Sequence, residues 1–126
     1  MPPPASTPRR GRKPRPRAGI PTTLLDPLDR FRGFLRVECG FSPHTLAAYL
    51  RDLTDLAEDL ARDGVATWNT AEPRHLVNHV RALKAKRSMA GASVIRHLAS
   101  IKAFCRWALG AGVLRQPWAA AFAAAT

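Results

Sequence analysis

The 126-residue sequence has only two cysteines, Cys39 and Cys105, and they lie far apart. Two distant cysteines cannot form a dense disulfide framework or, by themselves, a four-ligand zinc site. No apolar run approaches the roughly 20 residues that cross a bilayer, and the opening Met-Pro-Pro-Pro lacks the apolar stretch of a secretory signal. We therefore expect a cytoplasmic protein with no membrane partner, in which both cysteines are buried or near-buried thiols.

Acidic residues are missing from both ends of the chain. Residues 1–23 have six basic residues and no acid, residues 24–72 have five basic and nine acidic residues, and residues 73–126 have nine basic residues and no acid. The formal net charge is +11, and 46% of the residues are hydrophobic. The apolar content is enough for one folded core. The two basic regions indicate a polyanionic partner that contacts the tail and the second half.

Large apolar residues are almost absent from residues 1–23, which are rich in proline and arginine. Because such a segment cannot bury enough surface to offset its ordering entropy, a disordered basic tail is predicted, followed by one domain over residues 24–126. Residues 10–15 (RGRKPR) loosely match an AT-hook, an arm that lies in the minor groove of A·T-rich DNA. The alternative is a tail that contacts phosphates without choosing a sequence.

Apolar residues spaced three and four apart predict helices throughout the rest of the chain. We expect helices over about residues 23–39, 43–63, 72–86 and 91–109, with Ser42 as the N-cap of the second and Pro43 at its first position. A short alanine-rich helix should follow Pro117. No window alternates polar and β-branched residues, so no sheet is predicted. The expected fold class is all-α, a compact four-helix bundle with a short C-terminal helix.

The helix predicted over residues 91–109 carries an apolar stripe on one side. On the other side we expect small residues between arginines: Ser93, Arg96, Ala99, Ser100, Ala103 and Arg106. Small residues let a helix approach a DNA groove closely while guanidinium groups reach phosphate or guanine. His44 and Arg51 lie on the outer face of the helix that begins at residue 43, whose first turn offers free N–H groups. Lys86 and Arg87 indicate a phosphate-contacting loop. Ordinary solvated surface is the alternative for each of these segments.

Three segments resemble one protein family. Residues 42–53 (SPHTLAAYLRDL) are similar to the S-x-x-T-x-x-x-Y-x-x-D-L signature of tyrosine recombinases and phage integrases, within the N-terminal core-binding (SAM-like) domain of the Xer type. Residues 28–42 (LDRFRGFLRVECGFS) fit the helix before that signature, and residues 93–107 (SVIRHLASIKAFCRW) resemble the last long helix. In order and spacing, the resemblance covers about residues 24–122.

The resemblance implies half of a C-shaped clamp around double-stranded DNA, and contacts with neighbouring recombinase protomers. By position it also implies DNA contacts at Thr45, Arg51, Arg96, Ser100 and Lys102. Tyr49, Asp52 and Leu53 are interpreted as packing and capping residues. The complete predicted DNA-contacting set is His44, Thr45, Arg51, Lys86, Arg87, Ser93, Arg96, Ser100, Lys102 and Arg106.

Recombinases of this family cut DNA with a tyrosine nucleophile assisted by Arg, Lys and His. Tyr49 is the only tyrosine of this sequence and is predicted on the buried side of its helix, and no His-x-x-Arg occurs. The chain stops about where a linker to a catalytic domain would begin. We therefore expect no catalytic residue here and no strand-cleaving enzyme.

We expect no cofactor and no metal. His75 and His79 are one helical turn apart, but only Glu72 lies nearby as a further ligand, so they are interpreted as partly exposed or DNA-facing residues. The three tryptophans are expected to pack between helices. Two functions remain open: a DNA-binding recombinase module associated with the nucleoid, or a helical protein-interaction module that regulates a full-length recombinase.

Overall fold

The computed structural model describes residues 19–85 and 91–115. These residues form α1 (Thr22–Val37), α2 (Pro43–Arg62), the 3₁₀ turn η2 (Trp68–Thr70), α3 (Pro73–Ala85) and α4 (Gly91–Gly110), and contain no strand. The all-α prediction with four helices is therefore confirmed. Most of the predicted tail, Lys86, Arg87 and the predicted helix after Pro117 lie outside the described residues.

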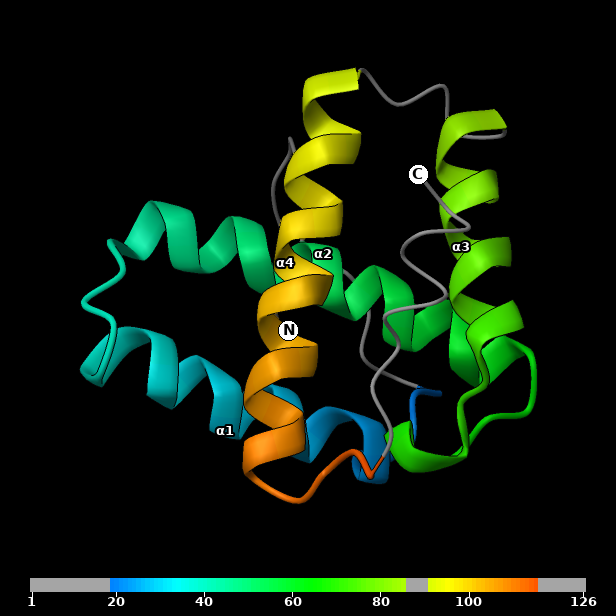
Figure 1. Cartoon of the computed structure of the whole chain (residues 1–126), viewed down its shortest axis with the longest axis horizontal. Coiled ribbons are helices and arrows are strands. Elements are labelled where there is room, and N and C mark those ends of the chain that lie inside the picture. Colours follow the sequence, from blue (N-terminus) through cyan, green and yellow to red (C-terminus); the bar gives the residue numbers. More distant parts are fainter. Residues whose placement is uncertain (1–18, 86–90, 116–126) are drawn as a thin grey trace, which may run out of the picture.

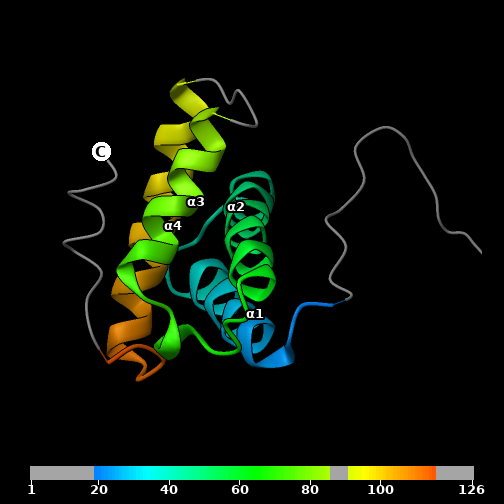
Figure 2. The same cartoon turned by 90° about the vertical axis from the view of Figure 1, so that its right-hand side faces the viewer.

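The helices form two antiparallel pairs that cross each other. In Figure 1, α1 and α2 run across the molecule while α3 and α4 run roughly perpendicular to them. In Figure 2, α3 lies in front of α4, and α1 and α2 pack against one side of this pair. The fold thus brings the middle of α4 against the middle of α2, which are more than 40 residues apart in sequence.

The start of α2 has the predicted capping chemistry. The side chain of Ser42 accepts a hydrogen bond from the backbone N–H of Thr45 at 3.2 Å, and Pro43 occupies the first helical position, where no N–H is needed. Gly40 before it has φ +67°, a left-handed conformation that glycine adopts without a steric penalty. The short turn between α1 and α2 therefore fixes where α2 begins.

An aromatic cluster joins the two helical pairs. The ring of Phe104 on α4 lies edge-on to Phe31 of α1, with 5.4 Å between ring centroids, and 4.6 Å from Trp68 of η2. The indole N–H of Trp68 donates to the carbonyl of Leu24 at 2.8 Å. Trp107 is half-buried and also packs on Phe31. The packing role predicted for these two tryptophans is confirmed, whereas Trp118 lies outside the described residues.

The two cysteines differ in environment. Cys105 is buried, as predicted, and burial raises the pKa of its thiol to about 12. Cys39 is exposed, so the prediction of a buried thiol was wrong there, because α1 ends at Val37 and Cys39 lies in the turn that follows. None of the helices in the described ranges is long and apolar enough to cross a membrane.

Candidate nucleic-acid interface

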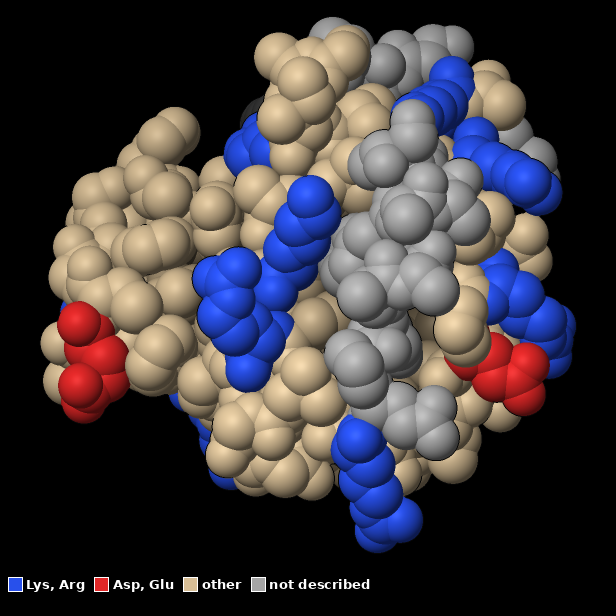
Figure 3. Space-filling model, in the orientation of Figure 1, with Lys and Arg blue, Asp and Glu red and all other residues tan. Residues whose placement is uncertain are grey.

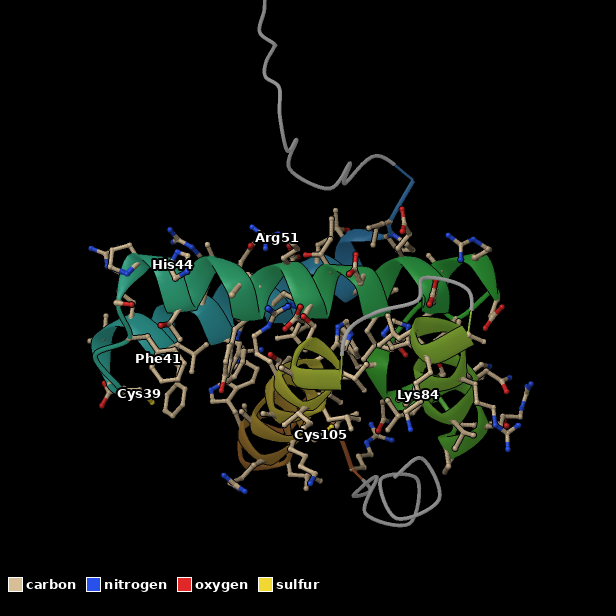
Figure 4. All side chains as sticks on the ribbon, turned by 90° about the horizontal axis from the view of Figure 1, so that it is seen from above. Cys39, Phe41, His44, Arg51, Lys84 and Cys105 are labelled. Atoms are coloured by element: carbon tan, nitrogen blue, oxygen red, sulfur yellow. The ribbon has the colours of Figure 1, made fainter. Side chains whose placement is uncertain are left out.

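The first half of α2 presents three of the predicted DNA-contacting side chains to solvent. His44, Thr45 and Arg51 are all exposed. Figure 4 looks down on α2 and on the N-terminal end of α4, and shows His44 and Arg51 along the edge of α2 that points away from α4. Thr45 lies two helical turns before Asp52, on the side of α2 that faces α4. No acid occurs between residues 43 and 51.

The exposed side of α4 is only partly the predicted one. Ala92, Ala99, Lys102 and Arg106 are exposed, and Ser93 is half-buried. The apolar side chain of Ile95, which precedes Arg96 in the sequence, is 71% exposed to solvent. The small side chains let another molecule approach this side of α4 closely.

Ser100 is completely buried, and its predicted DNA contact was wrong. Its hydroxyl donates to Asp52 Oδ2 at 3.0 Å and lies 3.1 Å from the carbonyl oxygen of Arg96. The physical reason is the crossing of α2 over α4, which covers Ser100 on one side of the helix. Periodicity within α4 could not reveal this neighbour.

Arg96 forms a two-pronged ion pair with the same carboxylate. Arg96 Nε donates to Asp52 Oδ2 at 2.9 Å, and Nη2 donates to Oδ1 at 2.6 Å. The Asp52 side chain is 2% exposed and that of Arg96 is 40% exposed. The guanidinium therefore closes over a buried carboxylate and still reaches the surface.

Burial by itself raises the pKa of Asp52, but the nearby His97 ring and the Arg96 guanidinium more than reverse this effect. The net result is a pKa of about 2. Asp52 is therefore ionised at neutral pH. It is neither a cap nor an apolar packing residue, and serves as the anionic centre of the α2–α4 contact.

Two histidines continue this polar network through the core. His79 Nε2 lies 2.8 Å from His97 Nε2, and His79 Nδ1 lies 2.5 Å from Asp59 Oδ2. His97 Nδ1 in turn lies 3.5 Å from Asp52 Oδ1. His75 is also buried, and its Nδ1 accepts from the backbone N–H of Glu72 at 2.9 Å.

The expectation that His75 and His79 are partly exposed or face DNA was therefore wrong. Both rings lie on the side of α3 that packs into the domain, where carboxylate, imidazole and backbone partners compensate their burial. Within residues 19–85 and 91–115, no group of three or more His, Cys, Asp or Glu residues could hold a metal ion.

The predicted residues do not form one surface. Thr45, Ser93 and Arg96 lie around the crossing of α2 and α4, whereas His44 and Arg51 lie along the edge of α2 that points away from α4. Lys102 follows Arg96 by six residues and so points about 120° away from the side of α4 that faces α2. Figure 3 shows Lys and Arg side chains gathered over α4 on the front face, with acidic side chains only at the two sides of the view. Lys102 and Arg106 therefore belong to a face of α4 separate from the α2 edge.

The sequence did not reveal the Asp52–Arg96 pair, although both residues stand in the segments that carried the family resemblance. One signal was available. Asp52 falls among apolar residues on the inner side of α2, where an acid needs a cationic partner to be tolerated. The position of that partner depends on how α4 crosses α2.

The pKa of Asp52 predicts how stability depends on pH. A carboxyl group whose pKa is lower in the folded state stabilises the fold above its unfolded value of 3.8, and this stabilisation is lost as the pH falls toward 2. The lowering corresponds to about 2 kcal/mol. We expect the difference in unfolding free energy between the unchanged chain and an Asp52→Asn variant to shrink by this amount between pH 5 and pH 2. Urea unfolding followed by circular dichroism measures it, and a difference that is constant with pH would contradict the prediction.

The architecture just described defines a small all-helical domain with basic and small side chains on the exposed sides of α2 and α4. The family model for the phage integrase N-terminal SAM-like domain matches residues 28–112, and the chain belongs to this family. The resemblance found in residues 42–53 and 93–107 is thereby confirmed.

Several tyrosine recombinases are similar to this chain. Tyrosine recombinase XerC of Serratia marcescens is 36% identical over 98 residues, which are 75% of this chain and 31% of that protein. XerC of Vibrio parahaemolyticus is 34% identical over 92 residues, 71% of this chain and 28% of the relative. XerD of Oceanobacillus iheyensis is 33% identical over 78 residues, 61% of this chain and 26% of the relative. The chain thus spans less than a third of the length of these relatives, and no solved structure matches it.

Proposed function

We propose that this domain binds double-stranded DNA through α2 and α4. It would serve as the DNA-binding domain of a recombinase system associated with the nucleoid. The observation that carries the proposal is the exposed surface around the α2–α4 crossing. Thr45, Ser93 and Arg96 lie on the sides of α2 and α4 that face each other, whereas the exposed His44 and Arg51 line the edge of the same half of α2 that points away from α4. Asp52 is the carboxylate at this crossing, and it is buried beneath Arg96.

Charge and shape both favour a polyanion at this surface. Residues 43–51 and 73–126 contain no acid, so nothing in these segments repels phosphate. The exposed Ala92 and Ala99 leave room for the backbone of α4 to approach a groove, and the major groove of B-DNA admits an α-helix. Lys102 and Arg106 lie on the other exposed face of α4, where their positive charges add to the attraction of the domain for phosphates.

We propose further that the described residues bind DNA without cutting it. Tyr49 is half-buried, and its ring packs edge-on against Phe41 at 5.1 Å between centroids. A phenol held in this way is poorly placed to attack a phosphodiester. Strand cleavage in such a system would then fall to residues other than 19–85 and 91–115.

A salt titration tests DNA binding by the full chain. We expect fluorescence anisotropy with a labelled 30-bp duplex to show affinity that falls steeply between 50 and 300 mM salt, with a log–log slope of about −0.9 per neutralised phosphate. No detectable binding at about 50 mM salt would refute the proposal.

Arg51→Gln should weaken binding by about eightfold at 0.1 M salt, because one phosphate contact is lost, and should make the slope about 0.9 less steep. Arg62→Gln is the matched control. It removes the same charge from the far end of α2, where Arg62 pairs with Asp59 at 2.6 Å. The control should bind within twofold of the unchanged chain, and equal losses in the two variants would indicate only a general charge effect.

The N-terminal tail is expected to contribute to binding without sequence preference. Deletion of residues 1–18 removes six basic residues and should lower the affinity and the salt slope by the same amount for every duplex. Comparing A·T-rich with G·C-rich duplexes of equal length measures this. A loss confined to the A·T-rich duplex would instead favour the AT-hook interpretation.

A groove between α1 and α4 supports the second candidate, a protein-interaction module that contacts recombinase protomers. It encloses about 640 Å³ and is lined mainly by apolar side chains, among them Phe31, Phe34, Phe41 and Trp107. Of the predicted DNA contacts, Arg106 also lines this groove, whereas Thr45, Ser93 and Arg96 do not, so both functions can coexist. Binding to a recombinase that persists at 300 mM salt, with no binding to DNA at 50 mM, would favour this function over the first.

A further inference from the structure

The Asp52 carboxylate contacts three side chains of α4. Oδ1 accepts from Arg96 Nη2 at 2.6 Å and lies 3.5 Å from His97 Nδ1, while Oδ2 accepts from Arg96 Nε at 2.9 Å and from the Ser100 hydroxyl at 3.0 Å. The His97 ring is in turn held by His79, and His79 by Asp59. Because Asp52, His97 and Ser100 are buried, the carboxylate keeps one position in the fold, although Arg96 itself is 40% exposed.

The two hydrogen bonds from Arg96 to Asp52 use only one edge of the guanidinium, the edge formed by Nε and Nη2. A guanidinium has five N–H donors in one plane, and the two bonds to Asp52 use one hydrogen of Nε and one of Nη2. Nη1 takes part in neither bond, and the side chain of Arg96 is 40% exposed. The free Nη1–Nη2 edge is the fork that matches two neighbouring acceptors such as O6 and N7 of guanine.

Pairing with a fixed carboxylate changes how such an arginine binds DNA. An unpaired surface arginine must lose considerable rotamer freedom to place its fork on a base edge, whereas Arg96 has already lost that freedom on folding. The negative charge of Asp52 also cancels much of the attraction of Arg96 for phosphates. The first effect strengthens binding to the right base, and the second weakens binding to DNA of any sequence.

Resting on the DNA-binding function proposed above, we propose that Asp52 is a positioning residue that holds Arg96 as a fixed two-pronged donor for a guanine edge in the major groove. Asp52 itself does not touch DNA. The pair thus determines specificity, while the other basic side chains of α2 and α4 supply affinity. The exposed Ile95 beside Arg96 adds an apolar side chain suited to a neighbouring thymine methyl group.

The test begins with the full chain and a random 20-bp duplex library. Duplexes retained by the unchanged chain are sequenced, and dissociation constants are measured for one enriched duplex and for a scrambled version of it. We expect a guanine enriched at one position, and the enriched duplex to bind at least about tenfold tighter than one with that guanine replaced.

Two variants then separate positioning from a structural role. Asp52→Asn keeps the size of the side chain and should abolish most of this tenfold preference, while binding scrambled DNA up to about eightfold tighter at 0.1 M salt because Arg96 gains a phosphate contact. Arg96→Lys keeps the positive charge and one ion-pair bond with Asp52, so we expect this variant to fold. It therefore tests the proposal even if Asp52→Asn does not fold. It should also lose the preference, with an unchanged salt slope.

The outcomes distinguish a failure of the DNA-binding function from a failure of the positioning role of Asp52. If the unchanged chain binds no duplex at about 50 mM salt, the proposed function itself fails. If it binds but enriches no guanine, or if the preference survives in the folded variants, the proposed function stands and the positioning role is wrong. An equal loss of affinity for both duplexes in Asp52→Asn would show that the pair supports only the fold.

Discussion

An Arg96→Ala variant should unfold about 3 kcal/mol more easily than the unchanged chain, because it leaves the buried charge of Asp52 without its main partner. Removing one member of a buried ion pair costs about 3–5 kcal/mol, and the lower end applies here because Arg96 is 40% exposed and water can replace it. Urea unfolding at pH 7, followed by circular dichroism, measures the change.

A double variant isolates the cause of this loss. Asp52→Asn added to Arg96→Ala should recover part of the stability, because it removes the buried carboxylate charge that Arg96→Ala leaves unpaired. Arg51→Ala, an exposed arginine next to Asp52 in sequence, should change stability by less than about 0.5 kcal/mol. If the double variant is less stable than Arg96→Ala by the full effect of Asp52→Asn alone, the two residues do not interact and the reasoning fails.

The second large effect is expected at Trp68. Trp68→Ala should lower the free energy of unfolding by about 3–5 kcal/mol, because it opens a cavity against Phe104 and leaves the Leu24 carbonyl without its indole donor. Trp68 is 1% exposed, so little of that cavity can fill with water. The melting temperature and urea midpoint of the variant measure the loss.

Trp68→Phe provides the matched control for the cavity. It keeps most of the aromatic packing and loses the hydrogen bond, so it should cost about 1–2 kcal/mol. Equal losses for the alanine and phenylalanine variants would mean that the hydrogen bond, and not the packing of Trp68, holds α1 and α4 together at this point.

The stability role of Arg96 changes how DNA-binding variants should be chosen. The sequence predicts Arg96 only as a DNA contact on the exposed side of its helix. In the structure the same side chain neutralises a buried acid, so a loss of binding in Arg96→Ala mixes two effects. Arg96→Lys and Arg51→Gln are better probes of the surface because both leave Asp52 with a cationic partner.

The helices could be predicted because their signals are local. Apolar spacing in α1, α2 and α4, the Ser42 cap and Pro43 all act within one or two helical turns. The structure places α1 at Thr22–Val37 and α2 at Pro43–Arg62, within two residues of the prediction at each end. The family resemblance rests on the same short segments, which is why it could be recognised from the sequence.

The candidate site was predicted less completely, because several of its residues depend on contacts between helices. His44 and Arg51 are exposed because nothing crosses their side of α2, as expected from α2 alone. Ser100 and His79 are polar residues whose burial the sequence does not indicate. In the structure α2 covers Ser100, and α4 covers His79. Helical periodicity gives the direction of a side chain on its own helix, but not which neighbour lies there.

The sequence by itself determined the helical class, the helix boundaries, the family and the basic, acid-free second half of the chain. Only the tertiary structure decided which polar residues of α2 and α4 face each other. The reason is physical: the Asp52–Arg96 pair spans 44 residues and forms only when two crossed helical pairs bring the middle of α2 against α4. That crossing turns an arginine predicted as a simple surface contact into one fixed by a buried carboxylate.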